Sequence, residues 1–248
     1  MSFEPSSVVP AGEHAAQPSP APDGRGDTGV TPALRLQILA TEHWSLLATR
    51  SLAWNEIWAR GGMLLSALSG AIVALALVGQ GTGFGSSFAL FGIVILPVVL
   101  FIGVTTYLRM STSNQLEAMT VIGMNRIRAA YLELAPDLEK YLVTAAHDDW
   151  RGVAVTMGRR AELDRLSLTT LLSATPVVVM VINAVVAGAI TGLTAIEVGL
   201  TGPVPVVLAV IAFVVVLAIH LSVGRRNVRR VQDGLVTRFP GQPAEPTW

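Results

Sequence analysis

The sequence of 248 residues contains no cysteine and is poor in charge. The absence of cysteine excludes disulfide bonds, thiolate catalysis and cysteine-ligated metal sites in this chain. Asp, Glu, Lys and Arg together make up only 14% of the residues, whereas a typical soluble domain has about 25%. The formal net charge is zero. This balance argues against a nucleic-acid-binding protein, because such a protein needs a basic surface.

Motifs of catalysis are also missing. The sequence has no His/Glu zinc signature, no nucleophile elbow, no phosphate-binding Gly-Lys loop and no dinucleotide fingerprint. The run His147-Asp148-Asp149 holds metal-ligating residue types, but adjacent residues seldom converge on one ion. We interpret this run as a solvated turn. We therefore expect a protein that is not an enzyme and that has no metal and no cofactor.

The sequence is rich instead in long stretches without charge. Hydrophobic residues make up 52% of the chain, and the mean hydropathy is +0.58. Residues 61–108, 167–196 and 198–224 contain no Asp, Glu, Lys or Arg. A bilayer core needs about 20 apolar residues per spanning helix. The stretch 61–108 therefore has room for two spans, and the stretches 167–196 and 198–224 have room for one span each.

We predict an all-α integral membrane protein with four transmembrane helices, at about 62–78, 88–108, 169–192 and 204–224. The run 79–87 separates the first two spans, and we interpret it as a loop because it is rich in glycine, which weakens a helix interior. A second loop, which contains Glu197, Gly199, Gly202 and Pro203, separates the last two spans.

The basic residues predict the orientation of these spans. All 17 Arg and Lys residues lie before the first span, between the second and third, or after the fourth. The two opposite loops hold a single charge, Glu197. Because cytoplasmic loops carry an excess of Arg and Lys, we expect a protein of the cell (plasma) membrane with both termini and the central loop in the cytoplasm.

The regions outside the spans differ in composition. We expect cytoplasmic amphipathic helices near 41–60, 115–135, 136–146 and 153–167. The tetrapeptide at 64–67 recurs at 171–174, which fits either an internal duplication or chance. The chain divides into a disordered Pro/Ala/Gly-rich tail (1–32), an amphipathic helix with a first hairpin (33–109), a cytoplasmic helical region (110–168), a second hairpin (169–224) and a basic, then Pro-rich tail (225–248).

Two tryptophans mark the approach to the first span. Trp54 and Trp58 are one helical turn apart just before the membrane, where indole rings favour the boundary between lipid and water. We interpret them as interfacial anchors. The alternative is that the helix 41–60 docks a partner or gates a pore.

A few residues inside the spans are candidates for pore lining or for contacts between helices. Asn183 lies near the middle of the third span, and an amide in hydrocarbon needs another helix, water or a second subunit to bond to. Prolines inside a span free a backbone carbonyl. With Asn183, the candidates are Thr105, Thr106, Ser173, Pro97 and Pro176.

Small residues recur at every fourth position in two spans. Such stripes let helix backbones approach closely, within one chain or between chains. The first span contains one stripe and the third span contains the other; their members are Gly62, Ser66, Gly70 and Ala74, and Ala184, Gly188 and Gly192.

Two hypotheses about function follow. The first is a non-enzymatic helical bundle that assembles with itself or with another membrane protein, which the small-residue stripes and the uncharged spans favour. The second is an oligomeric pore or uncoupled channel. A cytoplasmic helix that leads into a two-span hairpin resembles, in architecture alone, the predicted pore-forming membrane effectors of bacterial nucleotide-sensing defence systems. The expected partners are the lipid bilayer and a second copy or another membrane protein, and no nucleic acid.

Overall fold

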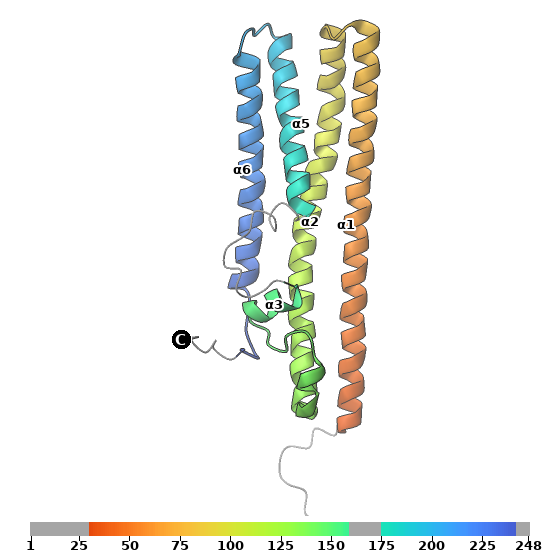
Figure 1. Cartoon of the computed structure of the whole chain (residues 1–248), viewed down its shortest axis with the longest axis vertical. Coiled ribbons are helices and arrows are strands. Elements are labelled where there is room, and N and C mark those ends of the chain that lie inside the picture. Colours follow the sequence, from red (N-terminus) through yellow and green to blue (C-terminus); the bar gives the residue numbers. More distant parts are fainter. Residues whose placement is uncertain (1–29, 159–174, 242–248) are drawn as a thin grey trace, which may run out of the picture.

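The computed structural model describes residues 30–158 and 175–241. The N-terminal tail up to residue 29, the end of the predicted helix 153–167, the start of the third span with Ser173, and residues 242–248 lie outside the described residues. Within the described ranges the secondary structure is helical, without β-strands (Figure 1). The predicted all-α class is therefore confirmed for these ranges, and four helices are long and apolar enough to cross a membrane, as many as predicted.

Helix α1 (Pro32–Thr82) is continuous, so the predicted amphipathic helix 41–60 and the first span form one element of 51 residues. Thr31 begins it by accepting a hydrogen bond from the Leu34 N–H at 3.2 Å, and Pro32 occupies the first turn. The helix ends where Gly83 adopts a left-handed conformation with φ of 74° and donates its N–H to the Gly79 carbonyl.

The predicted loop 79–87 is wrong in length, because only residues 83–85 connect the two helices. Gly79 and Gly81 lie inside α1 although glycine costs a helix about 1 kcal/mol. An apolar surrounding offers no water to bond to free backbone groups, so the helix continues until a positive φ stops it.

Helix α2 (Ser86–Leu134) is also continuous, and the second predicted span and the predicted helix 115–135 are parts of the same element of 49 residues. The polar run 111–114 between them does not break the helix. Thr112 and Thr120 each bond to the carbonyl four residues earlier, at 3.0 and 2.8 Å, so their hydroxyls are satisfied within the helix.

The segment after α2 is less helical than predicted. In place of a helix over 136–146 there is a short 3₁₀-helix, η1 (Pro136–Tyr141), followed by an irregular stretch. Helix α3 (Trp150–Thr156) begins earlier than the predicted 153. The last two helices, α5 (Thr175–Glu197) and α6 (Val204–Asp233), extend beyond the predicted ends of the third and fourth spans.

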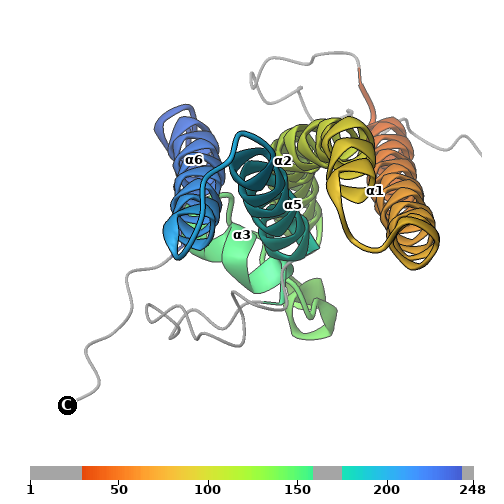
Figure 2. The same ribbon diagram turned by 90° about the horizontal axis from the view of Figure 1, so that it is seen from above.

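The four long helices form an open row. Figure 2 shows the order α1, α2, α5, α6 from one side to the other, with α3 beneath the row. Helix α1 packs along α2, α2 along α5, and α5 along α6, while α6 also touches α2. The core between the helices contains Leu64, Val99 and Val186. Helix α1 therefore forms one edge of the row.

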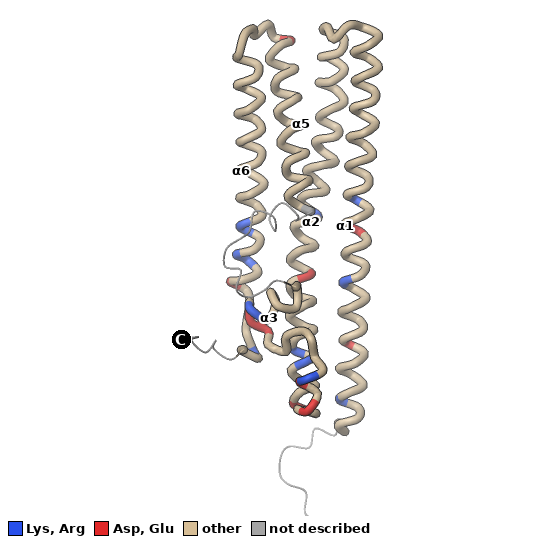
Figure 3. Tube along the Cα trace, in the orientation of Figure 1, with Lys and Arg blue, Asp and Glu red and all other residues tan. Residues whose placement is uncertain are grey.

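Charge divides the row into two parts along its length (Figure 3). We call the uncharged part the apolar layer, which consists of residues 61–82, 86–108, 175–196 and 204–224. These segments of 21–23 residues are about 32–35 Å long at 1.5 Å per residue, which matches a hydrocarbon core of about 30 Å. Beyond it, residues 32–60 of α1 and 109–134 of α2 run on together as a two-helix stalk.

Candidate functional sites

A cluster of polar residues inside the apolar layer joins α2, α5 and α6. The side chain of Asn183 on α5 is only 1% exposed, and its Nδ2 lies 3.2 Å from Nε2 of His220 on α6. The other ring nitrogen of His220 is 2.8 Å from the Val216 carbonyl. A carbonyl can only accept, so Nδ1 carries the proton and Nε2 is free to accept from Asn183. Both ring nitrogens of His220 and the Asn183 Nδ2 are thus hydrogen-bonded.

Tyr107 of α2 completes this cluster. Its hydroxyl donates to the backbone carbonyl of His220 at 2.5 Å, and the two rings meet edge to face with centroids 4.4 Å apart. The Asn183 Oδ1 atom has no conventional partner, but it points at Gly103, where an added Cβ would lie 1.8 Å away. The absence of a side chain at Gly103 therefore makes room for this oxygen.

The other predicted pore residues do not converge with Asn183 on a common passage within the described part of the chain. The Thr105 hydroxyl bonds to carbonyls of its own helix, those of Phe101 and Ile102, both at 3.0 Å. Thr106 is buried, Pro97 is exposed on α2, and Pro176 lines a cavity near the stalk. Ser173 lies outside the described residues. Of the candidates that the structure describes, Thr105, Pro97 and Pro176 thus lie in different surroundings from Asn183.

The two small-residue stripes have different surroundings. On α5, a Cβ added to Gly188 would lie 3.0 Å from the Ala209 carbonyl oxygen of α6, and one added to Gly192 would lie 3.4 Å from the Ala209 Cβ. Ala184 is fully buried. On α1, by contrast, a Cβ added to Gly62 or Gly70 meets nothing within 4 Å. The α5 stripe packs within the chain, whereas the exposed part of the α1 stripe faces away from it.

Ion pairs hold the two stalk helices together. Arg50 of α1 bonds to Glu117 of α2 at 2.9 Å, and the Trp54 indole N–H donates to the same carboxylate at 3.4 Å. Nearer the apolar layer, Glu56 pairs with Arg109 at 2.6 Å and with Arg60 at 3.0 Å. Hydrogen bonds from Arg109 and then Arg60 lower the pKa of Glu56 to about 2. Trp54 is thus bonded to α2, while Trp58 is 63% exposed.

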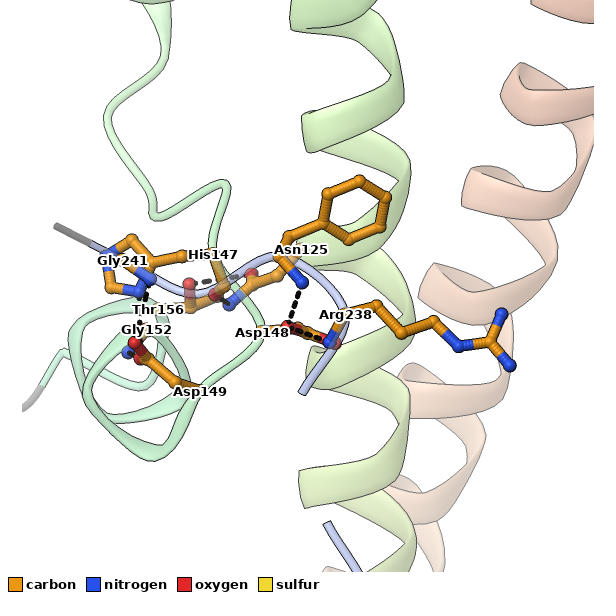
Figure 4. Close-up of polar contacts among 9 residues, drawn as sticks. Asn125, His147, Asp148, Asp149, Gly152, Thr156, Arg238 and Gly241 are labelled. Carbon is orange, nitrogen blue, oxygen red and sulfur yellow. Dashed lines mark hydrogen bonds and ion pairs between the residues drawn. The ribbon is translucent and has the colours of Figure 1, made fainter. Parts of the chain in front are cut away.

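The interpretation of His147-Asp148-Asp149 as a solvated turn is wrong. Asp148 is completely buried (0% exposed) and pairs with Arg126 of α2 at 2.7 Å. Its Oδ1 also accepts the backbone N–H groups of Arg238 and Phe239, at 3.0 and 2.8 Å, as Figure 4 shows for Arg238. A turn next to α2 therefore fixes the segment 235–241 that follows α6, and we call this arrangement the tail clamp.

Neighbouring groups complete the tail clamp (Figure 4). Asp149 caps α3 by accepting the Gly152 N–H at 2.7 Å, and its other oxygen accepts the Gly241 N–H at 3.0 Å. Asn125 of α2 donates to the His147 carbonyl at 2.9 Å and accepts from the Thr156 hydroxyl at 2.9 Å. The described residues contain no group of His, Asp or Glu that could hold a metal ion.

The tail clamp keeps both aspartates ionised. Burial by itself raises the pKa of Asp148, but the Arg126 hydrogen bond and the N–H groups of Phe239 and Arg238 together outweigh it and lower the pKa below its ordinary value. The pKa of Asp149 is lowered in the same way, where burial is outweighed by the N–H groups of Gly152 and Gly241 and by His147. The contacts that hold the tail therefore involve charged carboxylates.

Sequence reasoning missed the tail clamp because its partners are distant in the chain. Asp148 and Phe239 are 91 positions apart, and no local pattern connects them. One signal was present: an aspartate directly before an apolar helical stretch is a typical N-cap. That signal would have placed Asp149 at the start of α3, although it would not have found the buried partner of Asp148.

A cavity of about 330 Å³ lies where the stalk meets the apolar layer. Several of its polar groups are already bonded, since Asn227 donates to Ser111 at 2.6 Å and Glu117 is held by Arg50 and Trp54. Its remaining surface is largely apolar, formed by side chains that include those of Ile57, Met110, Trp150 and Val231. These contacts single out no charged ligand.

The fold and these sites define a class: an all-helical protein with four helices that could span a membrane, and with polar contacts that join helices. Comparisons with protein-family models, with curated proteins and with solved structures find no match to this chain. Its function is therefore argued from its own residues.

Proposed function

We propose that this chain is a multi-pass protein of the cell (plasma) membrane that acts through assembly in the membrane and not through catalysis. The end of the row that carries the stalk lies in the cytoplasm, together with the start of α1 and the end of α6. The distribution of charge supports this orientation, because the basic residues gather at that end (Figure 3) and cytoplasmic flanks are rich in Arg and Lys.

The observation that carries the proposal is the open row. Helix α1 packs along α2, and its opposite side has no neighbour within the described part of the chain. Inside the apolar layer, Asn183 bonds to the His220 side chain and the Tyr107 hydroxyl bonds to the His220 backbone carbonyl, and these groups offer no site for a reaction. The feature of the apolar layer that is left to act on another molecule is the uncovered surface of its helices.

The mass of the purified protein in lipid nanodiscs tests this proposal. We expect a mass of at least two chains per disc at a large excess of discs, where chance co-occupancy is rare. The same measurement in a mild detergent controls for trapping by the disc. A single chain in both environments would refute assembly with itself. Purification from native membranes with a second membrane protein in fixed ratio would then identify assembly with another partner.

The pore hypothesis gives a different result in liposomes. Because the predicted lining residues that the structure describes do not line a common passage within the chain, we expect vesicles that contain the protein to remain tight to ions. The matched variant is Asn183→Leu, which removes the polar group from the apolar layer. Ion flux in the original protein that disappears in this variant, with the mass in nanodiscs unchanged, would favour the pore.

The orientation has its own test, because the chain has no native cysteine. Ser87 and Thr237 are both exposed, Ser87 at the end of the row away from the stalk and Thr237 after α6. In intact cells, we expect an impermeant thiol reagent to label Ser87→Cys and to leave Thr237→Cys unlabelled until the cells are opened. The reverse pattern would overturn the orientation.

A further inference from the structure

The charges of α1 lie on one side of the helix. Five residues of α1 are charged. The buried Leu64 marks the side of α1 that packs on α2. At 3.6 residues per turn, all five charged side chains leave the helix within about 80° of the direction of the Leu64 side chain. They are Arg35, Glu42, Arg50, Glu56 and Arg60. The opposite side of α1 is uncharged along its whole length, including the stalk part outside the charge-free block.

This arrangement is inverted for a helix in water. A surface helix normally turns its apolar side to the core and its charges to solvent. In the stalk part of α1 the side away from α2 instead exposes Trp44 (70% exposed), Leu52 (69%) and Trp58. The stalk-side end of α6 has the usual pattern, with exposed Arg225, Arg226, Arg229 and Arg230. Large apolar side chains that cluster on an exposed surface mark an interaction site.

The same surface continues without a break into the apolar layer. We call it the outer face of α1. Between residues 48 and 66 small exposed residues form its middle, and the larger Leu52 and Trp58 lie toward its two margins. Before and after this stretch, the exposed Trp44 and Val73 lie on the same face. A Cβ added to Gly62 or Gly70 meets nothing within 4 Å, so another helix can approach the backbone closely. The small members are Ala48, Ser51, Asn55, Ala59, Gly62, Ser66 and Gly70.

We infer that the outer face of α1 binds the same face of a second copy of this chain, with the two α1 helices parallel. All copies insert in the same orientation, so two α1 helices related by a two-fold axis along the membrane normal place identical residues at equal depth. The uncharged face then meets an uncharged face both in the apolar layer and outside it. A charged partner helix would leave its charges unpaired against this surface.

The area is sufficient for a stable dimer. A helix of 51 residues is about 76 Å long at 1.5 Å per residue. A contact strip about 10 Å wide along it covers about 750 Å² on each copy, close to the roughly 800 Å² per partner of a standard interface. The contact would use the edge helix alone, so α2, α5 and α6 keep the packing that they have in the single chain.

Asn55 sets the register of the pair. It is exposed at the centre of the outer face, one heptad before Gly62 and one heptad after Ala48. In a parallel pair its amide meets its counterpart in the second copy, and the two can exchange hydrogen bonds. A single polar residue in such a seam specifies register and the number of helices at some cost in stability. Shifted pairings would leave the amide buried against apolar groups.

Disulfide cross-linking in native membranes tests this inference, which rests on the proposed assembly. Each probe has a neighbour on the same helix with similar exposure but a different direction. The probes are Ala48→Cys and Gly62→Cys on the outer face, and the controls are Thr49→Cys and Met63→Cys beside them. We expect each probe to form at least tenfold more cross-linked dimer than its control under mild oxidation. Equal yields, or more dimer from the controls, would overturn the inference.

The mass in nanodiscs separates this inference from the proposed function. Multiple chains per disc with no preference of the probes over the controls would refute the α1 pairing and leave assembly standing. Single chains per disc would refute both. A second variant, Gly62→Leu with Gly70→Leu, fills the outer face while leaving the contacts within the chain untouched. We expect it to convert dimers to single chains with an unchanged melting temperature of each chain.

Discussion

The carboxylate of Asp148 accepts the backbone N–H of Phe239 at 2.8 Å, although 91 positions separate the two residues. Arg126 reaches the same carboxylate from α2 and also donates to the Val236 carbonyl at 2.6 Å. The segment after α6 is thereby attached to the stalk. Because α6 leads directly into this segment, the tail clamp fixes the stalk-side end of the last helix relative to α2.

Replacing Asp148 should release the tail. In Asp148→Asn, the remaining side-chain oxygen can still accept the Phe239 N–H. The new NH₂ group, however, faces the Arg126 Nε–H, and two donors cannot bond to each other. The ion pair between residues 126 and 148 is therefore lost. Breaking a pair with a buried carboxylate costs about 2–4 kcal/mol. We expect a lower free energy of unfolding and faster hydrogen exchange at residues 235–241. Asp137→Asn, at an exposed position in η1, is the control and should change neither.

The tail clamp should weaken only in acid. The folded-state pKa values of Asp148 and Asp149 lie below the ordinary value, so the stability that these groups contribute is complete above the unfolded pKa of about 3.9 and is lost as the pH falls through the folded pKa. The difference in unfolding free energy between the original protein and Asp148→Asn should be constant from about pH 8 to pH 5 and shrink below about pH 4. A loss near pH 6 would contradict the assignment.

The contact between Gly103 and Asn183 should not tolerate a side chain. A Cβ at residue 103 would lie 1.8 Å from the Asn183 Oδ1, so α2 and α5 must separate or the amide must leave its place. Overpacking of this kind costs about 1–3 kcal/mol. We expect Gly103→Ala to lower the melting temperature in detergent. Gly81→Ala, where nothing lies within 4 Å, should not lower it and should raise it slightly, because alanine favours a helix interior over glycine.

Asn183 and His220 should be energetically coupled. Hydrogen bonds between membrane helices have coupling energies of about 0.6 kcal/mol on average and up to about 1.7. In a double-mutant cycle of Asn183→Leu and His220→Phe, we expect a favourable coupling in this range from unfolding in detergent mixtures. A cycle of Asn183→Leu with Ser222→Ala, whose hydroxyl bonds only within α6, should give a coupling near zero. Equal coupling energies in both cycles would contradict a specific hydrogen bond between Asn183 and His220.

Periodicity and charge were sufficient to predict the helical class and the four apolar helices. They failed where local signals of helix ends compete with continuity. The polar run 111–114 and the glycines 79 and 81 suggested breaks, yet the helices continue through them, because backbone groups in these long elements are best satisfied within the helix. From Pro136 the error was the opposite, and the predicted α-helix is a short 3₁₀-helix followed by irregular chain.

The sequence by itself determined which segments are apolar enough for a membrane and on which side the basic residues gather, because both depend on composition summed over about 20 residues. Only the tertiary structure decided what single polar residues do. It buried Asp148 against Arg126, paired Asn183 with His220 and left the outer face of α1 exposed among the residues that the structure describes. The physical reason is that a hydrogen bond or a helix contact depends on atoms a few ångströms apart, and in this chain those atoms come from residues that are distant in sequence.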